Sequence, residues 1–452
     1  MAEMLSQSTM RAKAGAKLDW YCLVGLGVLV TALTIATPFA FRAWGDHGYM
    51  ALTIAAGILT IGATRSAERT SPRNALVLIF GVAVLLRLVL VIVEPLLSTD
   101  IYRYVWDGRV QAAGLNPYRF FPADPALSAL RDQTIYPHVD KVDYAVTIYP
   151  PVAQVFFFLV TRISETVTMM KLALIGCEAV TVFVIWSLLK QLGKPTTRIV
   201  AYLWLPLPMW EIANNGHVDA LMVALMMLGV WLALQANPLR GAAVVALAVL
   251  AKPFALFALP PLWRAWDWKM PALVIAVLAL CYVPYLSVGT GVLGFLTTGY
   301  LQEESLASGD TIWPLAAWRW LFGIVRGDVV VYWSVALLVV GVMALAASLR
   351  ESRSAETVIA DINKLLLAAL FLISPNYPWY FLAIAPFVAL QGGAPVWAAS
   401  IGALLLQEEA GWGEYIPILL RKSVLYGAFI AACAFAIWRT WTTPNVAWRH
   451  PA

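Results

Sequence analysis

Residues 75–97 read ALVLIFGVAVLLRLVLVIVEPLL, and this stretch decides the fold. A helix rises about 1.5 Å per residue, so a helix of this length exceeds the roughly 30 Å hydrocarbon core of a bilayer. Arg87 and Glu94 interrupt the apolar run. Together with Glu178 of a later run, we expect them to take part in buried ion pairs that brace the bundle. The stretch therefore predicts a transmembrane helix, which ends where polar sequence begins at Ser98.

The composition of the whole chain extends this conclusion. Of its 452 residues, 61% are hydrophobic and 13% are charged, and the mean hydropathy is +0.76. A soluble domain carries about 25% charged residues. The composition excludes a cytosolic enzyme, a disordered chain and a small secreted module. The repeated long apolar runs instead predict an all-α, polytopic bundle of about twelve to fourteen transmembrane helices.

Basic residues orient these helices, because Lys and Arg concentrate in cytoplasmic loops. Apolar runs at 20–41 and 48–64 precede the quoted stretch, and Arg65, Arg69 and Arg73 lie in the short loop between them and residue 75. That loop is therefore predicted to be cytoplasmic, so the chain leaves the membrane on the outer side after residue 97. We expect a multi-pass protein of the cell inner (plasma) membrane.

The stretch that follows, residues 98–166, is predicted to be a long extracytoplasmic loop. It mixes charges of both signs with aromatic residues, a composition typical of the membrane interface. Residues 152–160 are apolar but too few to span, so we expect an interfacial helix there. If they spanned, Lys190, Lys194 and Arg198 would lie outside, against the charge rule.

We treat residues 1–452 as one integral membrane domain in three parts: three helices in 1–97, the outer loop in 98–166 and the remaining helices in 167–452. A second outer loop is predicted near residues 287–328. Lys252-Pro253 should break the run at 241–263, because proline interrupts a helix and such breaks are tolerated beside a cavity. No internal repeat is evident, which argues against an inverted-repeat transporter. The other predicted spans are 168–189, 199–212, 218–234, 271–286, 329–349, 359–373, 379–390, 395–406 and 423–438.

Four polar groups lie at the predicted outer ends of helices. Polar residues at membrane depth are costly, so they are functional candidates, although caps and interfacial aromatic belts are the alternative interpretation. Cytoplasmic charge alone fixed the topology, yet it places all four groups on one side. The groups are STDIYRYVWDG at 98–108 followed by GLNPY at 114–118, NNGHVD at 214–219, AKP at 251–253 and SPNYPWY at 374–380.

The first group resembles the first outer loop of GT-C-type glycosyltransferases. An Asp after an early membrane helix, a Tyr/Arg-rich stretch and Gly-x-Asn-Pro-Tyr are most similar to polyprenol-phosphate-mannose-dependent mannosyltransferases. The Tyr-Pro-Pro turn at 149–151, the Asn-Gly-His-Val-Asp segment and the Lys-Pro break also resemble that superfamily, over residues 87–390 in layout. The resemblance implies transfer of a sugar, most simply mannose, from a polyprenyl phosphate to a lipid or glycan acceptor. It also implies that Asp100 is the catalytic base.

The chemistry of such a donor fits the residues. The lipid phosphate is already a good leaving group, so it needs cations and no general acid. One carboxylate is then enough to take the proton of the acceptor hydroxyl, with attack from the opposite face and inversion. Asp107, seven residues after Asp100, is the alternative base or a partner of the site.

Other members of the four groups are expected to bind substrate. Lys252, His217 and Arg103 are the candidates for the phosphate, through charge-assisted hydrogen bonds. One histidine near Asp219 offers too few ligands for a metal, so neither a metal nor a cofactor is expected. The aromatic residues are candidates to stack on sugar or to hold the prenyl chain. The remaining predicted substrate-binding residues are Tyr104, Asp219, Asn376, Tyr377, Trp379 and Tyr380.

Three other functions stay open. A flippase or transporter of lipid-linked sugars predicts charges at the midplane and pseudo-symmetric halves. A non-catalytic scaffold of polymer assembly tolerates the loss of Asp100. A ligase or polymerase of lipid-linked glycans shares the outer site but takes a diphosphate donor. The expected partners are a polyprenyl-phosphate sugar, a lipid or glycan acceptor and membrane lipids, and no nucleic acid. No nucleotide-binding motif is present, so the donor of a transferase should be lipid-linked.

Overall fold

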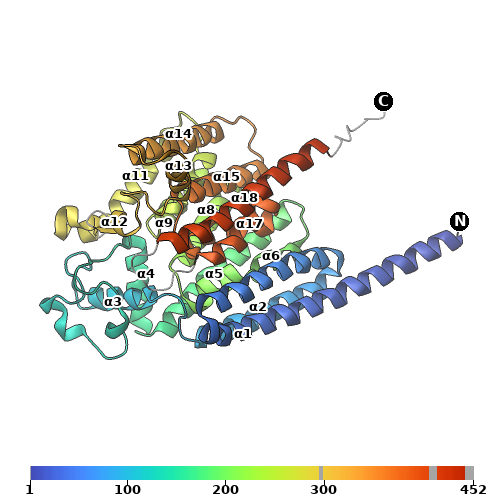
Figure 1. Ribbon diagram of the computed structural model, residues 1–452, viewed down its shortest axis with the longest axis horizontal. Helices are drawn as coiled ribbons and strands as arrows, with labels where there is room; N and C mark the ends of the chain where they lie inside the picture. Colours follow the sequence, from blue (N-terminus) through green and yellow to red (C-terminus); the bar gives the residue numbers. More distant parts are fainter. Residues whose placement is uncertain (1, 295–298, 407–414, 443–452) are drawn as a thin grey trace.

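The computed structural model describes residues 2–294, 299–406 and 415–442, and every regular element in these ranges is a helix (Figure 1). The predicted all-α, polytopic fold is therefore confirmed. Within the described ranges, six helices are long and apolar enough to cross a membrane. They are α1 (Ala2–Arg69, of which Lys17–Arg69 is the candidate span), α2 (Pro72–Ile92), α5 (Val167–Gln191), α11 with η6 (Lys269–Tyr282 and Val283–Leu293), α14 (Asp328–Ser348) and α18 (Tyr415–Thr442).

The first of these helices reverses its direction. Gly45 adopts φ 56° and ψ −145°, a conformation that favours glycine, and the chain turns back there. In the returning arm, Gly62 lies against Leu26 of the first arm. The two arms correspond to the separate runs predicted at 20–41 and 48–64, and Figure 1 shows them lying antiparallel beside α2.

Among the described residues, the full-length spans are fewer than the twelve to fourteen predicted from sequence, even when the two arms of α1 are counted separately. Several predicted spans are instead short or broken helices that begin at prolines, because proline lacks an N–H and clashes with the preceding turn. One pair, Pro206–Asn214 and Asp219–Leu234, bends by 120° at its break and brings the number of candidate spans to at most seven. The shorter elements are η3 (Thr196–Ile199), α6 (Val200–Leu203), α7 (Pro206–Pro208), η4 (Met209–Asn214), α8 (Asp219–Leu234), α9 (Pro238–Val249), η5 (Pro253–Ala258), α10 (Leu259–Leu262), α15 (Ala355–Ile373), η8 (Pro378–Ile384), α16 (Ala385–Leu390), α17 (Ala394–Gly402) and η9 (Ala403–Leu405).

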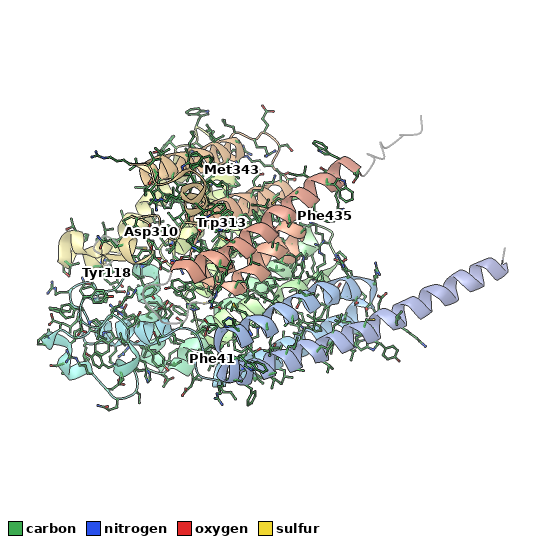
Figure 2. The ribbon with its side chains drawn as sticks, viewed as in Figure 1. Phe41, Tyr118, Asp310, Trp313, Met343 and Phe435 are labelled. Carbon is green, nitrogen blue, oxygen red and sulfur yellow. The ribbon has the colours of Figure 1, made fainter. Side chains whose placement is uncertain are left out.

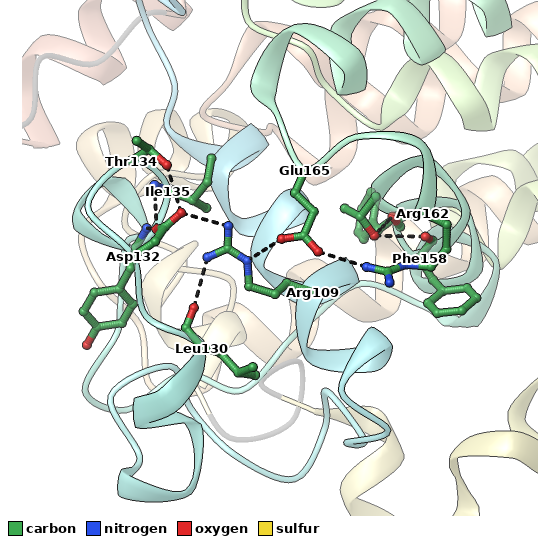
Figure 3. Close-up of polar contacts among 11 residues, drawn as sticks. Arg109, Leu130, Asp132, Thr134, Ile135, Phe158, Arg162 and Glu165 are labelled. Carbon is green, nitrogen blue, oxygen red and sulfur yellow. Dashed lines mark hydrogen bonds and ion pairs between the residues drawn. The ribbon is translucent and has the colours of Figure 1, made fainter.

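The loop after α2 folds into short helices: α3 (Asp100–Ala112), η1 (Pro125–Leu130), η2 (Tyr136–His138) and α4 (Pro151–Ile163). At about 1.5 Å per residue, α4 is about 20 Å long, too short to span the bilayer, as the sequence predicts. Arg109 braces the loop through Asp132 Oδ2 and Glu165 Oε2, each at 2.8 Å (Figure 3). Burial opposes ionisation of Asp132, but hydrogen bonds from Arg109, from two backbone N–H groups and from Thr134 together outweigh it and hold its pKa below the usual range.

The segment between η6 and α14 contains α12 (Leu301–Glu303) and α13 (Trp313–Phe322). Trp313 stacks on Tyr426 of α18 with ring centroids 4.3 Å apart, and Arg319 pairs with Asp310 and Asp328 (Trp313 and Asp310 are labelled in Figure 2). These contacts fix the segment against the helices that follow it.

A buried ion pair braces α2 against α5. Arg87 Nη2 lies 2.7 Å from Glu178 Oε1, and its Nε donates to Oε2 at 3.2 Å. This confirms the ion pair expected for these two residues. Glu94 does not join them, because it is exposed just beyond the end of α2.

Candidate active site

The four polar groups of the sequence meet at one place in the structure. Asp100 begins α3, His217 follows the π-helical turn η4, Lys252 precedes η5 and Trp379 lies in η8. Asp100 faces His217, and His217 stacks on Trp379. The candidate site is defined here as Asp100, His217, Asp219, Lys252, Trp379 and Tyr380.

Two asparagines hold the chain that leads into Asp100. Asn214 accepts a hydrogen bond from the backbone N–H of Leu96 at 3.1 Å and donates to the carbonyl of Glu94 at 3.0 Å. Asn215 accepts from the backbone N–H of Leu97 at 3.3 Å. Both asparagines are fully buried, and their amides satisfy three backbone groups of the chain that leads into α3. The NNGHVD segment therefore fixes the position of Asp100 as well as contributing side chains.

Gly216 makes the turn that aims His217 at Asp100. Its φ is +72°, and a Cβ there would lie 2.3 Å from Cδ1 of Ile101. Glycine is therefore required both for the conformation and for the close approach. After the turn, His217 Nδ1 lies 3.8 Å from Asp100 Oδ2, while its ring stacks on Trp379 at 4.1 Å.

Lys252 and Asp219 form an ion pair beside this histidine. Lys252 Nζ lies 2.7 Å from Asp219 Oδ2 and 4.2 Å from the centroid of the Tyr380 ring. The Lys252 backbone is extended, which confirms the helix break predicted at Lys252-Pro253. Within the described residues, Oδ1 of Asp219 is buried and accepts no hydrogen bond. A substrate hydroxyl would satisfy it.

Aromatic side chains form one wall of the candidate site. Tyr377 stacks on Trp379 with centroids 4.4 Å apart and planes 6° apart, which extends the stack that ends on His217. The hydroxyl groups of Tyr300 and Tyr380 hydrogen-bond to each other. A row of flat ring faces of this kind suits contact with a sugar ring or a prenyl chain.

Asn376 connects this wall to the last helix. It donates to Glu304 Oε2 at 3.3 Å, and its Oδ1 accepts from Lys422 Nζ at 2.8 Å. Lys422 of α18 is fully buried and also donates to the carbonyl of Ser374 at 2.6 Å. The SPNYPWY group is therefore anchored by α18.

Asp107 lies away from His217 and holds Arg103. Its Oδ1 accepts from Arg103 Nε at 2.9 Å, its Oδ2 accepts from Gln154 Nε2 at 2.9 Å, and the residue is 1% exposed. Arg103 also donates to the carbonyl of Ala145 at 3.1 Å. Of the two carboxylates considered as the base, Asp107 is committed to these bonds, whereas the Asp100 side chain is 29% exposed.

Arg103 and Asp100 line a small cavity of about 40 Å³ together with Asp140, Lys141 and Tyr149. Burial raises the pKa of Asp140, and the neighbouring Asp100 raises it further. Two carboxylates and two cations thus meet beside α3. No motif in the loop sequence indicates that Asp140 and Lys141 lie near Asp100.

Tyr104 lies beneath the site and is 1% exposed. Its ring stacks on Phe157 with centroids 4.5 Å apart, and its hydroxyl accepts from the backbone N–H of Val218 at 3.4 Å. The structure therefore places Tyr104 as a support between α3 and the start of α8, although the sequence suggested a substrate contact.

Glu304 and Glu211 also reach the site but were not singled out from the sequence. Burial raises the pKa of Glu304 to about 7, although Lys141, Lys422 and Lys252 act to lower it. Glu211 is fully buried, with Oε2 lying 3.2 Å from His217 Nε2. Its signal was present, since a lone acidic residue inside an apolar run is a functional candidate. Nothing in the sequence around Glu304 distinguishes it from other loop acids.

No group of three or more His, Cys, Asp or Glu suited to a metal occurs in the part of the chain that the structure describes. The positive groups around Asp100 are side chains: Lys252, Arg103 and Lys141, with His217 when protonated. Such a cluster can bind an anion such as a phosphate ester.

The chain is similar to known mannosyltransferases. The family described as "alpha-(1->6)-mannopyranosyltransferase, N-terminal domain" matches residues 15–268. Alpha-(1->6)-mannopyranosyltransferase A of Mycobacterium tuberculosis is 24% identical over 387 residues, an alignment that covers 76% of this chain and 71% of the relative. No solved structure shows a significant match.

Proposed function

Because the chain belongs to the alpha-(1->6)-mannopyranosyltransferase family and is therefore a membrane glycosyltransferase that transfers mannose, we propose that its donor is a polyprenyl-phosphate mannose. Mannose passes to a lipid or glycan acceptor on the outer face of the inner membrane. Asp100 is the catalytic base of this reaction.

One observation carries the proposal: Asp100 is a partly exposed carboxylate that faces His217 and shares a small cavity with two cations and with Asp140. His217 lies 3.8 Å from it, and Arg103 and Lys141 share its small cavity. In the reaction the acceptor oxygen bonds to the anomeric carbon, its proton goes to Asp100, and the bond from that carbon to the phosphate oxygen breaks. The departing lipid phosphate gains one negative charge, which Lys252 stabilises.

Direct displacement by the acceptor inverts the anomeric centre. The state of the other nearby carboxylates supports this course, because retention by double displacement needs a second ionised carboxylate as nucleophile. Asp140 shares the cavity with Asp100, but burial and the neighbouring Asp100 raise its pKa and so disfavour its ionised form. Asp107 is engaged with Arg103 and Gln154, and Asp219 with Lys252. If the product is α-linked, as the family name states, an inverting enzyme requires a β-linked donor.

An apolar cavity supports a lipid-linked donor. A space of about 650 Å³ lies among α14, α15, α17 and α18, with Met343, Phe371 and Phe429 among the lining residues. Tyr426 is among the lining residues, and one turn away Lys422 bonds to Asn376. We propose that this cavity holds part of the prenyl chain while the phosphate lies near Lys252.

Purified protein in lipid nanodiscs tests the donor. It is given labelled mannose on a polyprenyl phosphate or on a nucleotide diphosphate, with a membrane extract as the source of acceptor. Transfer from the lipid donor alone is expected. Transfer from the nucleotide sugar, and none from the lipid, would contradict the proposal.

A further inference from the structure

Glu211 is a buried carboxylate to which the proposed reaction assigns no role. It lies in the π-helical turn η4, and its exposed fraction is 0%. Removing a carboxylate from water is costly, so polar partners must offset the cost. Asn215 Nδ2 donates to its Oε2 at 3.1 Å, and His217 Nε2 lies 3.2 Å from the same oxygen. Single π-helical turns within helices occur frequently at functional sites.

His217 lies between this carboxylate and the proposed base. Nε2 faces Glu211 at 3.2 Å, and Nδ1 faces Asp100 at 3.8 Å. The histidine is fully buried, and its ring stacks on Trp379 with planes 22° apart. Stacking restricts tilting of the ring, but it does not determine which nitrogen faces Asp100. The contact with Glu211 determines which nitrogen faces Asp100.

We propose that Glu211 is a positioning residue that acts on the transfer reaction through His217. A carboxylate attracts an N–H, so Glu211 favours the ring orientation in which a protonated Nε2 points toward Glu211. The other ring nitrogen, Nδ1, then faces Asp100. Neither ring nitrogen of His217 makes a well-aligned hydrogen bond within the described part of the chain. Catalytic hydrogen bonds often tighten only when substrate binds.

The same segment of chain holds both partners. Asn215, which donates to Glu211, also accepts from the backbone of Leu97, three residues before Asp100. The distance between Glu211 and Asp100 is thereby fixed, with the imidazole between them. The other charged groups near this pair are Asp219 and Lys252, which lie near His217, and Asp46, which with Glu211 lies near Tyr49. This inference rests on the proposed role of Asp100.

A double-mutant cycle tests the inference in the full-length protein with polyprenyl-phosphate mannose. Glu211→Gln should lower kcat by about 10-fold or more, since misplacement of an active-site group is costly, and should change the donor KM less than about 3-fold. In the His217→Asn background, Glu211→Gln should add nothing, because the residue through which it acts is gone. Glu178→Gln, which removes an equally buried carboxylate from the Arg87 pair, is the matched control. Its effect should combine multiplicatively with that of His217→Asn.

Two results would overturn the inference. One is a wild-type kcat in Glu211→Gln, and the other is multiplication of the Glu211→Gln and His217→Asn effects. If Glu211→Gln does not fold, the cycle is run with Glu211→Asp, which keeps the charge but withdraws the oxygen from Nε2, and the same non-additivity is required. Asp100→Asn separates the two levels of the argument. Wild-type turnover in that variant contradicts the proposed function, whereas a slow Asp100→Asn with a normal Glu211→Gln contradicts this inference alone.

Discussion

Lys252 Nζ lies 2.7 Å from Asp219 Oδ2 and 4.2 Å from the centroid of the Tyr380 ring. Asp219 is almost fully buried, whereas the Lys252 side chain keeps 16% of its surface exposed. An ammonium group has three donor hydrogens, and Asp219 accepts one. The pair therefore holds the cation in place and leaves it able to bind a second anion, which in the proposed reaction is the phosphate of the donor.

Replacement of Lys252 tests this assignment. Lys252→Ala should lower kcat/KM for the lipid donor by about 10²–10³-fold, because a preorganised charge at the leaving group is lost. Lys269→Ala, at an exposed lysine of α11, is the control and should behave as wild type. An active Lys252→Ala protein with unchanged kcat/KM would move the phosphate elsewhere. Steady-state kinetics of both variants give the answer.

Glu304 should make stability depend on pH. Burial raises its pKa to about 7 from the ordinary value of 4.5, so the folded protein holds the proton more tightly than the unfolded chain. The free energy of unfolding should therefore fall as the pH rises between these two values. Glu304→Gln is neutral throughout and lacks this fall.

The measurement for Glu304 is the Tm of detergent-purified wild type and Glu304→Gln between about pH 5 and 8, a range that spans the raised pKa. The variant should gain in Tm relative to wild type as the pH rises. All other titrating groups are common to both proteins and cancel in the difference. Parallel curves would show that Glu304 titrates normally.

The all-α fold and the meeting of the four polar groups were predictable from the sequence. Long apolar runs predict membrane helices, and basic loops predict that the four groups lie on one side. Charge asymmetry placed NNGHVD and AKP at the same side, and the structure brings His217 and Lys252 together. The number of long helices was not predictable from apolar runs alone. Pro206, Pro253 and Pro378 divide such runs into short helices, and a hydropathy profile does not detect these breaks.

The division of labour between Asp100 and Asp107 also required coordinates. Seven residues separate them along one helix, so sequence spacing treats them as equivalent. Only the position of Gln154 on α4, which bonds Asp107, distinguishes them. The role of Glu304 also could not be predicted from the sequence, because its burial arises from contacts with distant residues such as Asn376.

Sidedness is testable by thiol labelling in a variant that lacks the four native cysteines. Ser128 is exposed in the first loop. A cysteine there should react with an impermeant maleimide added to cells whose outer envelope layers have been removed and whose inner membrane is intact. A cysteine at exposed Arg264 should react only after permeabilisation. The reverse pattern would place the candidate site in the cytoplasm.

Filling the apolar cavity should weaken binding of long prenyl chains. Ala368 lines the cavity, and Ala368→Trp should raise the KM for a long-chain donor more than that for a short-chain analogue. Val335→Trp, on the exposed face of α14, adds the same bulk outside the cavity and is the control. Equal effects on long and short donors would remove the cavity from the donor path.

The central claim is that Asp100 accepts the proton of the acceptor hydroxyl. Asp100→Asn keeps the shape of the side chain but cannot act as a base, and general-base assistance is typically worth about 10²–10⁴-fold. The decisive measurement is the single-turnover rate of mannose transfer by purified wild type, Asp100→Asn and Asp107→Asn, each loaded with donor. Asp100→Asn should bind donor normally and react at least ~100-fold more slowly, while Asp107→Asn should lose less. A near wild-type rate in Asp100→Asn would contradict the account, and an inactive Asp107→Asn beside it would transfer the role of base to Asp107.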